Sequence, residues 1–219
     1  MIFAVSFGEY LGDDADRLFG LMIEHAQIVL VSVAIAVTIG VGLGVLTYRS
    51  EGPRHAVLAV TGVFLTIPSF ALFGLLISPL GLGTTPAVVA LVMYALLPIV
   101  RNTITGLREV DPAVVESAQG MGMGRWRRLA RIELPLAWPV IITGIRVSTQ
   151  ILVGIAAIAA VINGPGLGKD IFRALARVGT PTALNQALAA VLGIVILGLM
   201  LDIAYLLIGR LTTSRGLRE

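Results

Sequence analysis

The sequence predicts an all-α, polytopic membrane protein with five transmembrane helices. The chain has 219 residues, of which 57% are hydrophobic and only 13% are charged, and its mean hydropathy is +0.94. A soluble domain carries about 25% charged residues. The apolar residues also form long runs without Asp, Glu, Lys or Arg, as helices need to cross a bilayer core about 30 Å thick. These two observations exclude a soluble globular domain.

The apolar runs place the five helices along the chain. In order, the predicted spans cover residues 26–47, 56–79, 85–100, 138–162 and 183–209. The second and third come from one run that is too long for a single span, and the glycines and proline of residues 80–86 favour a turn that divides it. Each of the last two spans contains one charge, Arg146 or Asp202. Residues 26–209 are therefore predicted to form a single transmembrane domain.

The distribution of Lys and Arg indicates the orientation, because cytoplasmic segments collect these residues. Most of them lie between the first two spans, in residues 101–136, or after residue 209. Residues 1–25 are acidic, with one arginine among five Asp and Glu residues. We therefore expect the N-terminus outside, with an interfacial helix on the outer side within residues 1–25, and a cytoplasmic tail at residues 210–219.

The segment 101–136 is the long loop on the predicted cytoplasmic side, and long loops between packed helices are usually functional. Asp111 followed by Pro112 predicts the start of a short helix over residues 113–119. Three glycines follow this helix at alternate positions. A second, basic helix begins near Arg125 and is expected to end where Pro135 and Pro139 lead into the fourth span. Such an element presents a compact surface to a partner in the cytoplasm.

The loop resembles the EAA loop of ABC importer permeases, which reads Glu-Ala-Ala, three residues, Gly, nine residues, Ile, any residue, Leu-Pro. The chain departs from this pattern only at Ser117, which replaces the first alanine. The resemblance implies a type I ABC importer (MetI-like) permease fold whose short helix docks into a groove of an ATP-hydrolysing subunit. The residues that it implicates in coupling are Glu116, Ser117, Ala118, Gly122, Ile132, Leu134 and Pro135.

Four further stretches are Thr66-Ile-Pro-Ser69, the run from Leu96 to Pro112, Gly144-Ile-Arg-Val-Ser148 and Asn163-Gly-Pro-Gly-Leu-Gly168. With these stretches the chain resembles, from about residue 26 to 210, permeases of osmoprotectant uptake, which move glycine betaine, carnitine, choline or proline betaine. The resemblance implies a transport subunit, not an enzyme, that works by alternating access. Its partners would be a pair of ATP-binding subunits, a second permease copy or a paralogue, an extracytoplasmic substrate-binding protein and the lipid bilayer of the inner membrane, with no nucleic acid. ATP and Mg would be used by the partner ATPase. We expect no cofactor, catalytic residue or metal site in this chain, which has no cysteine.

Two alternatives are open on the sequence alone. One is an ABC permease for methionine or another small solute, because methionine permeases share the fold and the loop. The other is an ion-coupled secondary carrier or channel. A carrier of that class is expected to place ionisable residues near the midplane of the membrane.

Arg146 and Asp202 are the charges inside the predicted spans. Counted from the cytoplasmic ends of their helices, both lie about 10 to 12 Å deep at 1.5 Å per residue. Because an unpaired charge in the membrane is costly, we expect an ion pair between the two helices, with Gln150 as a polar neighbour. The alternative is that Arg146 lines the inner part of the pathway.

Two further groups are candidates for the pathway and its gate. Pro68 is predicted in the middle of the second span, where it would open the helical backbone. The candidate pathway residues are Thr66, Pro68, Ser69, Phe70 and Gln150; the alternative for Pro68 is a kink that only improves packing. The glycine-rich segment after the fourth span lacks the Ser or Thr of a phosphate-binding loop. By resemblance it is a flexible outer gate loop, formed by Asn163, Gly164, Gly166 and Gly168.

Overall fold

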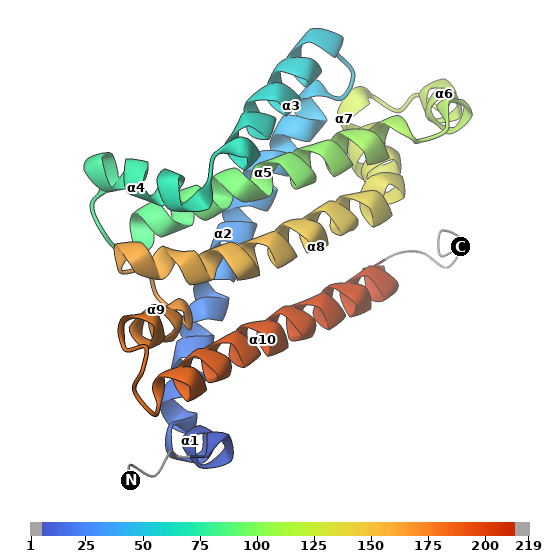
Figure 1. The fold of residues 1–219 in the computed structure, drawn as a ribbon. Coiled ribbons are helices and arrows are strands. Elements are labelled where there is room, and N and C mark those ends of the chain that lie inside the picture. Colours follow the sequence, from blue (N-terminus) through green and yellow to red (C-terminus); the bar gives the residue numbers. More distant parts are fainter. Residues whose placement is uncertain (1–5, 213–219) are drawn as a thin grey trace. The chain divides into compact units, whose positions relative to one another are not determined.

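The computed structural model describes residues 6–212, and every regular element in this range is helical (Figure 1). The α-helices are α1 (Phe7–Asp13), α2 (Ala15–Thr47), α3 (Glu51–Thr66), α4 (Ser69–Leu80), α5 (Thr84–Arg108), α6 (Pro112–Gly120), α7 (Arg125–Arg128), α8 (Leu134–Ile158), α9 (Gly168–Ala176) and α10 (Ala183–Thr212). A π-helix, η1 (Leu129–Glu133), joins α7 to α8, and a 3-10 helix, η2 (Ala159–Ile162), follows α8. The predicted all-α class is confirmed.

Four helical stretches are long and apolar enough to cross a membrane. They are Ala15–Thr47, Thr84–Arg108, Arg125–Ile162 and Ala183–Thr212. A fifth span results if α3 and α4 are counted together. The expected set of five spans is therefore compatible with the described residues, although the boundaries differ from the predicted ones.

The prediction of one continuous helix over residues 56–79 is wrong. The helix ends at Thr66, and Pro68 lies outside both helices as the N-cap of α4, with φ −57° and ψ 131°. Proline disfavours the helical region for the residue before it and supplies no N–H of its own. The chain therefore breaks at Ile67 and Pro68 instead of bending within a helix.

The prediction that Pro135 and Pro139 end the basic helix is also wrong. The helical stretch runs without interruption from Arg125 to Ile162. A proline ring clashes with the carbonyl one turn earlier in a regular α-helix, and the wider π-helical turn of η1 lies where Pro135 would cause this clash. Local widening of the helix therefore accommodates the proline.

The two ends of the chain also differ in detail from the prediction. Helix α2 begins at Ala15, so the first span extends well before residue 26. The short helix α1 precedes it and begins with a capping box, in which the hydroxyl of Ser6 accepts from the N–H of Glu9 and the carboxylate of Glu9 accepts from the N–H of Ser6. At the other end, residues 210–212 still belong to α10, and the rest of the predicted tail lies outside the described residues.

The chain divides into two compact units. The first is built from residues 6–34, Ile67–Val92 and Thr149–Leu201. The second is built from Ile35–Thr66, Met93–Ser148 and residues 202–212. In the first unit, Leu21, Leu167 and Ala190 form a buried apolar cluster.

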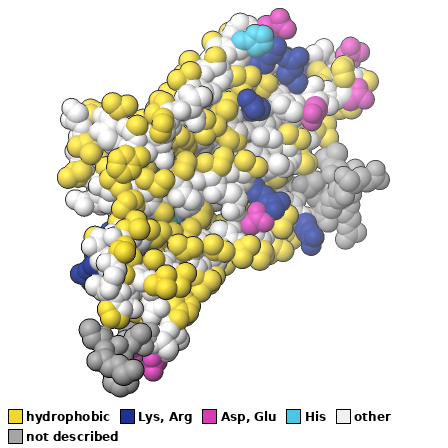
Figure 2. Space-filling model, viewed as in Figure 1, with side chains coloured by type: hydrophobic (Ala, Val, Ile, Leu, Met, Phe, Trp, Pro, Cys, Tyr) yellow, Lys and Arg dark blue, Asp and Glu magenta, His cyan; other side chains and the backbone are white. Residues whose placement is uncertain are grey.

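Glycines bring the helices of the second unit into close contact. A Cβ on Gly44 of α2 would lie 2.6 Å from Thr103 of α5, and one on Gly144 of α8 would lie 2.6 Å from Asn102. Small residues at helix contacts are typical of membrane proteins, because they let backbones approach closely. Most of α10 remains exposed. Only 11% of its most apolar 18-residue stretch is buried within the chain, and Figure 2 shows apolar side chains over its visible surface.

Candidate functional site

The short helix α6 is built as the sequence predicts. Asp111 is its N-cap, and the carboxylate accepts a hydrogen bond of 2.8 Å from the N–H of Ala113. Pro112 occupies the first turn, where a missing N–H costs no helical hydrogen bond. In Figure 1 the helix lies beyond the end of α5, apart from the long helices of its unit. A short capped helix in this position is available to a partner.

The three residues at the start of the motif face in different directions. Ala118 is 1% exposed and anchors α6, whereas Glu116 and Ser117 are exposed. The hydroxyl of Ser117 donates to the carbonyl of Ala113 within the helix, at 2.8 Å. Glu116 has no hydrogen-bond or ion-pair partner within residues 6–212. Its carboxylate is therefore available to accept hydrogen bonds from a docked surface.

Gly122 is required for the backbone that follows α6. Its φ is +77°, a left-handed conformation that glycine adopts without steric cost, while a Cβ there would meet open space. Its N–H donates to the carbonyl of Gln119 at 2.8 Å. The motif glycine therefore ends the helix by its conformation and not by close packing.

The second half of the motif lies where η1 passes into α8. Ile132 and Leu134 are half-buried, and Pro135 is exposed. Helix α6 contacts both α7 and η1. The fold therefore brings the two halves of the motif together, with the glycine turn between them.

A buried ionic cluster lies beside this motif, and the sequence did not predict it. Glu133 is 1% exposed, and its carboxylate accepts hydrogen bonds from the hydroxyl of Tyr48 at 2.7 Å, from Arg49 at 2.9 Å and from Arg128 at 2.8 Å. Arg128 is itself 4% exposed. A buried carboxylate is tolerated when it is paired and hydrogen-bonded, and here both conditions hold. We call Tyr48, Arg49, Arg128 and Glu133 the Glu133 cluster.

The Glu133 cluster joins the end of the first span to the base of the loop. Tyr48 and Arg49 follow α2, whereas Arg128 and Glu133 belong to α7 and η1. Burial and the hydrogen bond to Glu133 raise the pKa of the Tyr48 hydroxyl, which keeps it protonated as a donor. The signal in the sequence was weak, because Glu133 occupies the unspecified position of the motif and a π-helix leaves no recognisable pattern.

A groove connects the Glu133 cluster to α6. It has a volume of about 410 Å³, and its walls include Tyr48, Arg49, Arg108, Glu116, Gln119 and Glu133. The exposed face of α6 and the buried cluster are thus two sides of one site.

Arg146 and Asp202 form the ion pair that was predicted from the sequence. The guanidinium donates from Nε to one carboxylate oxygen at 2.6 Å and from Nη2 to the other at 2.7 Å, joining α8 to α10. Two parallel hydrogen bonds are the strongest geometry for this pair. One turn further along α8, the amide of Gln150 donates to the carbonyl of Gly198 at 3.0 Å. Gln150 therefore also connects α8 to α10.

The remaining candidate pathway residues lie at the break between α3 and α4. The hydroxyl of Thr66 donates to the carbonyl of Val63 at 2.8 Å and so satisfies the end of α3. Ser69 opens α4, and Phe70 is 62% exposed. Pro68 is exposed as well. Pro68 and Phe70 are therefore left largely uncovered by the other side chains of residues 6–212.

The glycine-rich loop after η2 was expected to be flexible, but in the structure it is tightly packed. Gly164, Gly166 and Gly168 are buried, and a Cβ on Gly168 would overlap the carbonyl of Ala157. Gly166 has φ +103° and lies against His25, where a Cβ would come within 2.8 Å. The glycines are needed because the backbone of the loop packs directly on its neighbours.

Polar contacts hold the same loop against α2. Asn163 adopts a left-handed conformation with φ 60°. The carboxylate of Glu24 accepts from the N–H of Gly166 at 3.1 Å and from the ammonium of Lys169 at 2.8 Å. The loop is therefore fixed at both its backbone and its charged end.

Comparisons with known proteins agree with this architecture. The family described as binding-protein-dependent transport system inner membrane component matches residues 36–214. The chain is 40% identical to the osmoprotectant import permease protein OsmW of Salmonella typhimurium, over 95% of this chain and 98% of that protein. It is 37% identical to the glycine betaine/carnitine/choline transport system permease protein OpuCB of Bacillus subtilis, over 89% of this chain and 88% of that protein.

The fold is also found in solved structures. A chain of the MetNI methionine ABC transporter in an inward-facing conformation matches with a TM-score of 0.77 and 23% identity, over 90% of this chain and 96% of that chain. A chain of an amino acid ABC transporter matches with a TM-score of 0.74 and 18% identity, over 94% and 98%. At these identities the likeness shows the fold alone. Together with the family match, it shows that this chain belongs to the family of binding-protein-dependent transport system inner membrane components and is a permease subunit of an ABC importer.

Proposed function

We propose that this chain is the permease subunit of an ATP-driven importer for quaternary-amine osmoprotectants: glycine betaine, carnitine, choline or proline betaine. The observation that supports this substrate class best is the 40% identity to an osmoprotectant import permease over nearly the full length of both chains. A choline transport permease, OpuBB of Bacillus subtilis, is a further relative, at 38% identity over 75% of this chain and 76% of that protein. The chain itself does no covalent chemistry in this proposal.

Helix α6 is the element that we assign to coupling. It would dock into a groove of the partner ATPase, with the exposed carboxylate of Glu116 accepting hydrogen bonds from that subunit. Ala118 and the contacts of α6 with α7 and η1 support the helix from behind. Movement of the ATPase would then reach η1 and the end of α2 through the Glu133 cluster.

The assembly that we propose has two permeases and two ATP-binding subunits. Five spans do not by themselves enclose a pathway that closes at alternate ends, so a second copy or a paralogue would complete it. The break between α3 and α4 supports placing Thr66, Pro68, Ser69 and Phe70 on this pathway, because broken helices in transporters lie where they border a cavity. ATP binding and hydrolysis, with Mg, would take place in the partner subunits.

The orientation follows from the charges, with the N-terminus outside and the C-terminus in the cytoplasm. In this orientation the loop with Asn163, Gly164, Gly166 and Gly168 lies on the outer side, where the substrate-binding protein delivers its ligand. The tight packing of the loop favours a rigid loop at the outer gate over a loop that opens and closes.

Transport in proteoliposomes tests the proposal. The chain is purified with its ATPase and its second permease, and the binding protein is added on the side of α1. We expect uptake of radiolabelled glycine betaine, choline or carnitine that requires ATP inside the vesicles and the binding protein outside them. Methionine serves as the competing substrate.

Other outcomes would decide for the alternatives. Uptake of methionine and none of the quaternary amines would overturn the substrate class. Uptake that needs no ATP and collapses with an ionophore would indicate an ion-coupled carrier instead.

A further inference from the structure

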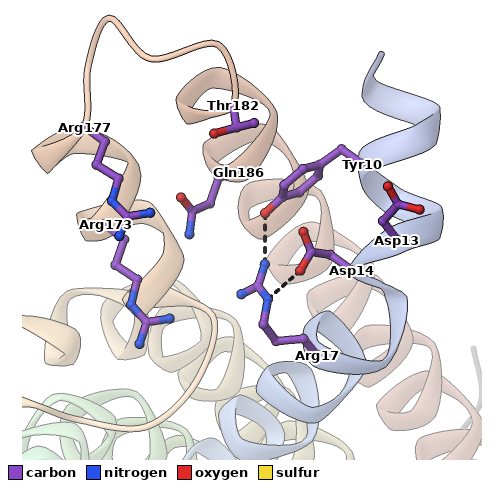
Figure 3. A pocket seen from close by; sticks show the side chains of 8 residues that line it. All are labelled: Tyr10, Asp13, Asp14, Arg17, Arg173, Arg177, Thr182 and Gln186. Atoms are coloured by element: carbon purple, nitrogen blue, oxygen red, sulfur yellow. Dashed lines mark hydrogen bonds and ion pairs between the residues drawn. The ribbon is translucent and has the colours of Figure 1, made fainter. Parts of the chain in front are cut away.

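A polar pocket lies at the ends of the helices of the first unit (Figure 3). It has a volume of about 470 Å³ and is walled by α1, the start of α2, α9 and the start of α10. Its walls include Tyr10, Asp13, Arg17, Arg173, Arg177 and Gln186. None of these side chains has a role in coupling or in the proposed pathway.

The floor of this pocket is fixed by a buried carboxylate. Asp170 is fully buried and accepts hydrogen bonds from Arg17 at 2.6 Å and from Gln186 at 3.2 Å. Arg17 also donates to Asp14 at 2.7 Å and to the hydroxyl of Tyr10 at 2.9 Å. The hydrogen-bonding capacity of Arg17 is therefore largely used within the protein.

Two other arginines have N–H donors that are available to a ligand. Arg173 and Arg177 lie one turn apart at the end of α9 and extend along the same wall in Figure 3. The side chain of Arg173 is 55% exposed and makes only a long contact of 3.4 Å with Asp170. Arg177 is exposed and has no ion-pair partner within residues 6–212. Asp13, which belongs to α1 on the opposite wall, likewise has no ion-pair partner in that range.

An apolar groove lies along the same helices as the polar pocket, and its wall residues follow those of the pocket in α1, α2 and α10. It has a volume of about 180 Å³, and its walls include Leu11, Phe19, Met22, Leu192, Gly193 and Ile196. Leu11 follows Tyr10, and Ala189, another wall residue, lies one turn after Gln186. The pocket and the groove therefore lie on consecutive stretches of the same helices, with no wall residue in common.

The groove has the depth and the exposure of a lipid-facing site. From Gln186 to Ile196, α10 advances about 15 Å, which is half of a hydrocarbon core of about 30 Å. Phe19 is 59% exposed and Leu192 is 42% exposed, so the groove opens on the surface that an inner membrane permease turns toward lipid. Gly193 contributes no side chain and leaves the groove deep.

From this arrangement we infer that the pocket and groove bind a glycerophospholipid with an amine-bearing head group. The phosphate is held by Arg173 and Arg177, whose guanidinium groups match its oxygens in pairs. The ammonium of the head group faces Asp13, and one acyl chain lies in the groove. A water-soluble anion would leave the groove unused, whereas a hydrocarbon chain alone would leave both charged walls unpaired. The bound lipid would link α1, α9 and α10 at the level of the head groups.

Native mass spectrometry of the full-length chain tests this assignment. The purified protein is titrated with phosphatidylethanolamine and with phosphatidylglycerol of the same acyl composition. We expect Arg177→Gln to weaken binding of both lipids by about tenfold, because it removes a charge-assisted contact to the phosphate they share. Asp13→Asn should weaken binding of phosphatidylethanolamine only.

The groove is tested separately from the head group. Gly193→Leu places a side chain in the groove, and its Cβ meets only the flexible end of Leu167, at 3.0 Å. We expect this variant to lower retention of both lipids about tenfold. The matched controls are Gly154→Leu, whose Cβ has no neighbour within 4 Å, and Arg127→Gln, which removes an exposed arginine outside the pocket. Both should bind lipid as the wild type does.

Four results would overturn the inference. If Arg177→Gln and Gly193→Leu both retain lipid as the wild type does, the lipid does not bind at this site. Equal affinity for both lipids, unchanged by Asp13→Asn, would show that the site does not recognise the amine of the head group. Protection from thermal unfolding by inorganic phosphate alone, equal to that by lipid, would indicate a site for a soluble anion. A shift of Gly193→Leu from dimer to monomer, with unchanged lipid binding, would show that a second copy of the chain covers the groove.

Discussion

The hydroxyl of Tyr48 donates a hydrogen bond of 2.7 Å to the carboxylate of Glu133, although 85 residues separate them. Tyr48 follows the first span, and Glu133 lies at the base of the loop that carries α6. Because Arg49 and Arg128 bind the same carboxylate, the contact is part of a buried network and not a surface pair. Such networks hold their elements in one arrangement only when every member is satisfied.

We expect substitutions in this network to lower stability in a definite order. Glu133→Ala leaves Arg128 buried without its partner, and loss of one member of a buried ion pair costs about 3–5 kcal/mol. Tyr48→Phe removes one hydrogen bond to a charged group and should cost about 1.5–3 kcal/mol. Thermal unfolding of the purified variants in one detergent measures both. A smaller loss for Glu133→Ala than for Tyr48→Phe would contradict the network.

Glu116→Ala should separate coupling from folding. The side chain is exposed and has no partner in the described chain, so insertion and thermal stability should match the wild type. Loss of one charge-assisted hydrogen bond at the docked surface should weaken ATPase binding by about tenfold and lower substrate-stimulated ATP hydrolysis. Glu109→Ala, an exposed carboxylate just before α6, is the control and should keep full stimulation. Unchanged stimulation in Glu116→Ala would remove its coupling role.

Periodicity and local capping predicted the elements whose structure is decided locally. Asp111 and Pro112 marked the start of α6 correctly, because a cap and a first-turn proline act within a few residues. The equal depth of Arg146 and Asp202 argued for their pairing, because the membrane penalises an unpaired charge and fixes the depth of each residue along its helix.

Features that depend on tertiary contacts could not be predicted in this way. Pro68 and Pro135 have the same local chemistry, yet one breaks a helix and the other is accommodated by a π-helical turn. The packed state of Gly168 depends on the backbone of Ala157, which no sequence pattern indicates. The carboxylate of Glu133 is paired with Tyr48 and Arg49 from beyond its own segment, which the local sequence around Glu133 does not indicate.

The ion pair between Arg146 and Asp202 predicts recovery on exchange of charges. Arg146→Asp or Asp202→Arg alone places two like charges together within the membrane and should lower the amount of inserted protein and its transport. The double exchange restores opposite charges and should recover much of both. Immunoblots of membranes and uptake assays measure the two effects. No recovery would favour the alternative in which Arg146 lines the pathway.

The packed loop makes a sharp prediction about its glycines. Gly168→Ala places a Cβ against the carbonyl of Ala157, and overpacking of this kind costs about 1–3 kcal/mol or more. Gly154→Ala, in the interior of α8 with open space around its Cβ, should be neutral or stabilise by up to about 1 kcal/mol. Thermal unfolding of the two variants compares the same chemical change at two sites. Equal stability would show that the backbone of the loop does not pack on Ala157.

The absence of cysteine makes the orientation directly measurable, because any introduced thiol is the only one in the chain. Gly12 in α1 and Gly52 at the start of α3 are both exposed, and a Cβ added at either would have no neighbour within 4 Å, so cysteine fits at both sites. Arg49 and Arg54 flank Gly52, and basic segments stay on the cytoplasmic side. A membrane-impermeant maleimide should therefore label Gly12→Cys in intact cells and Gly52→Cys only in inverted vesicles. The reverse pattern would place α6 outside the cell, where no ATPase is available to it, and the proposed coupling role would fail with the orientation.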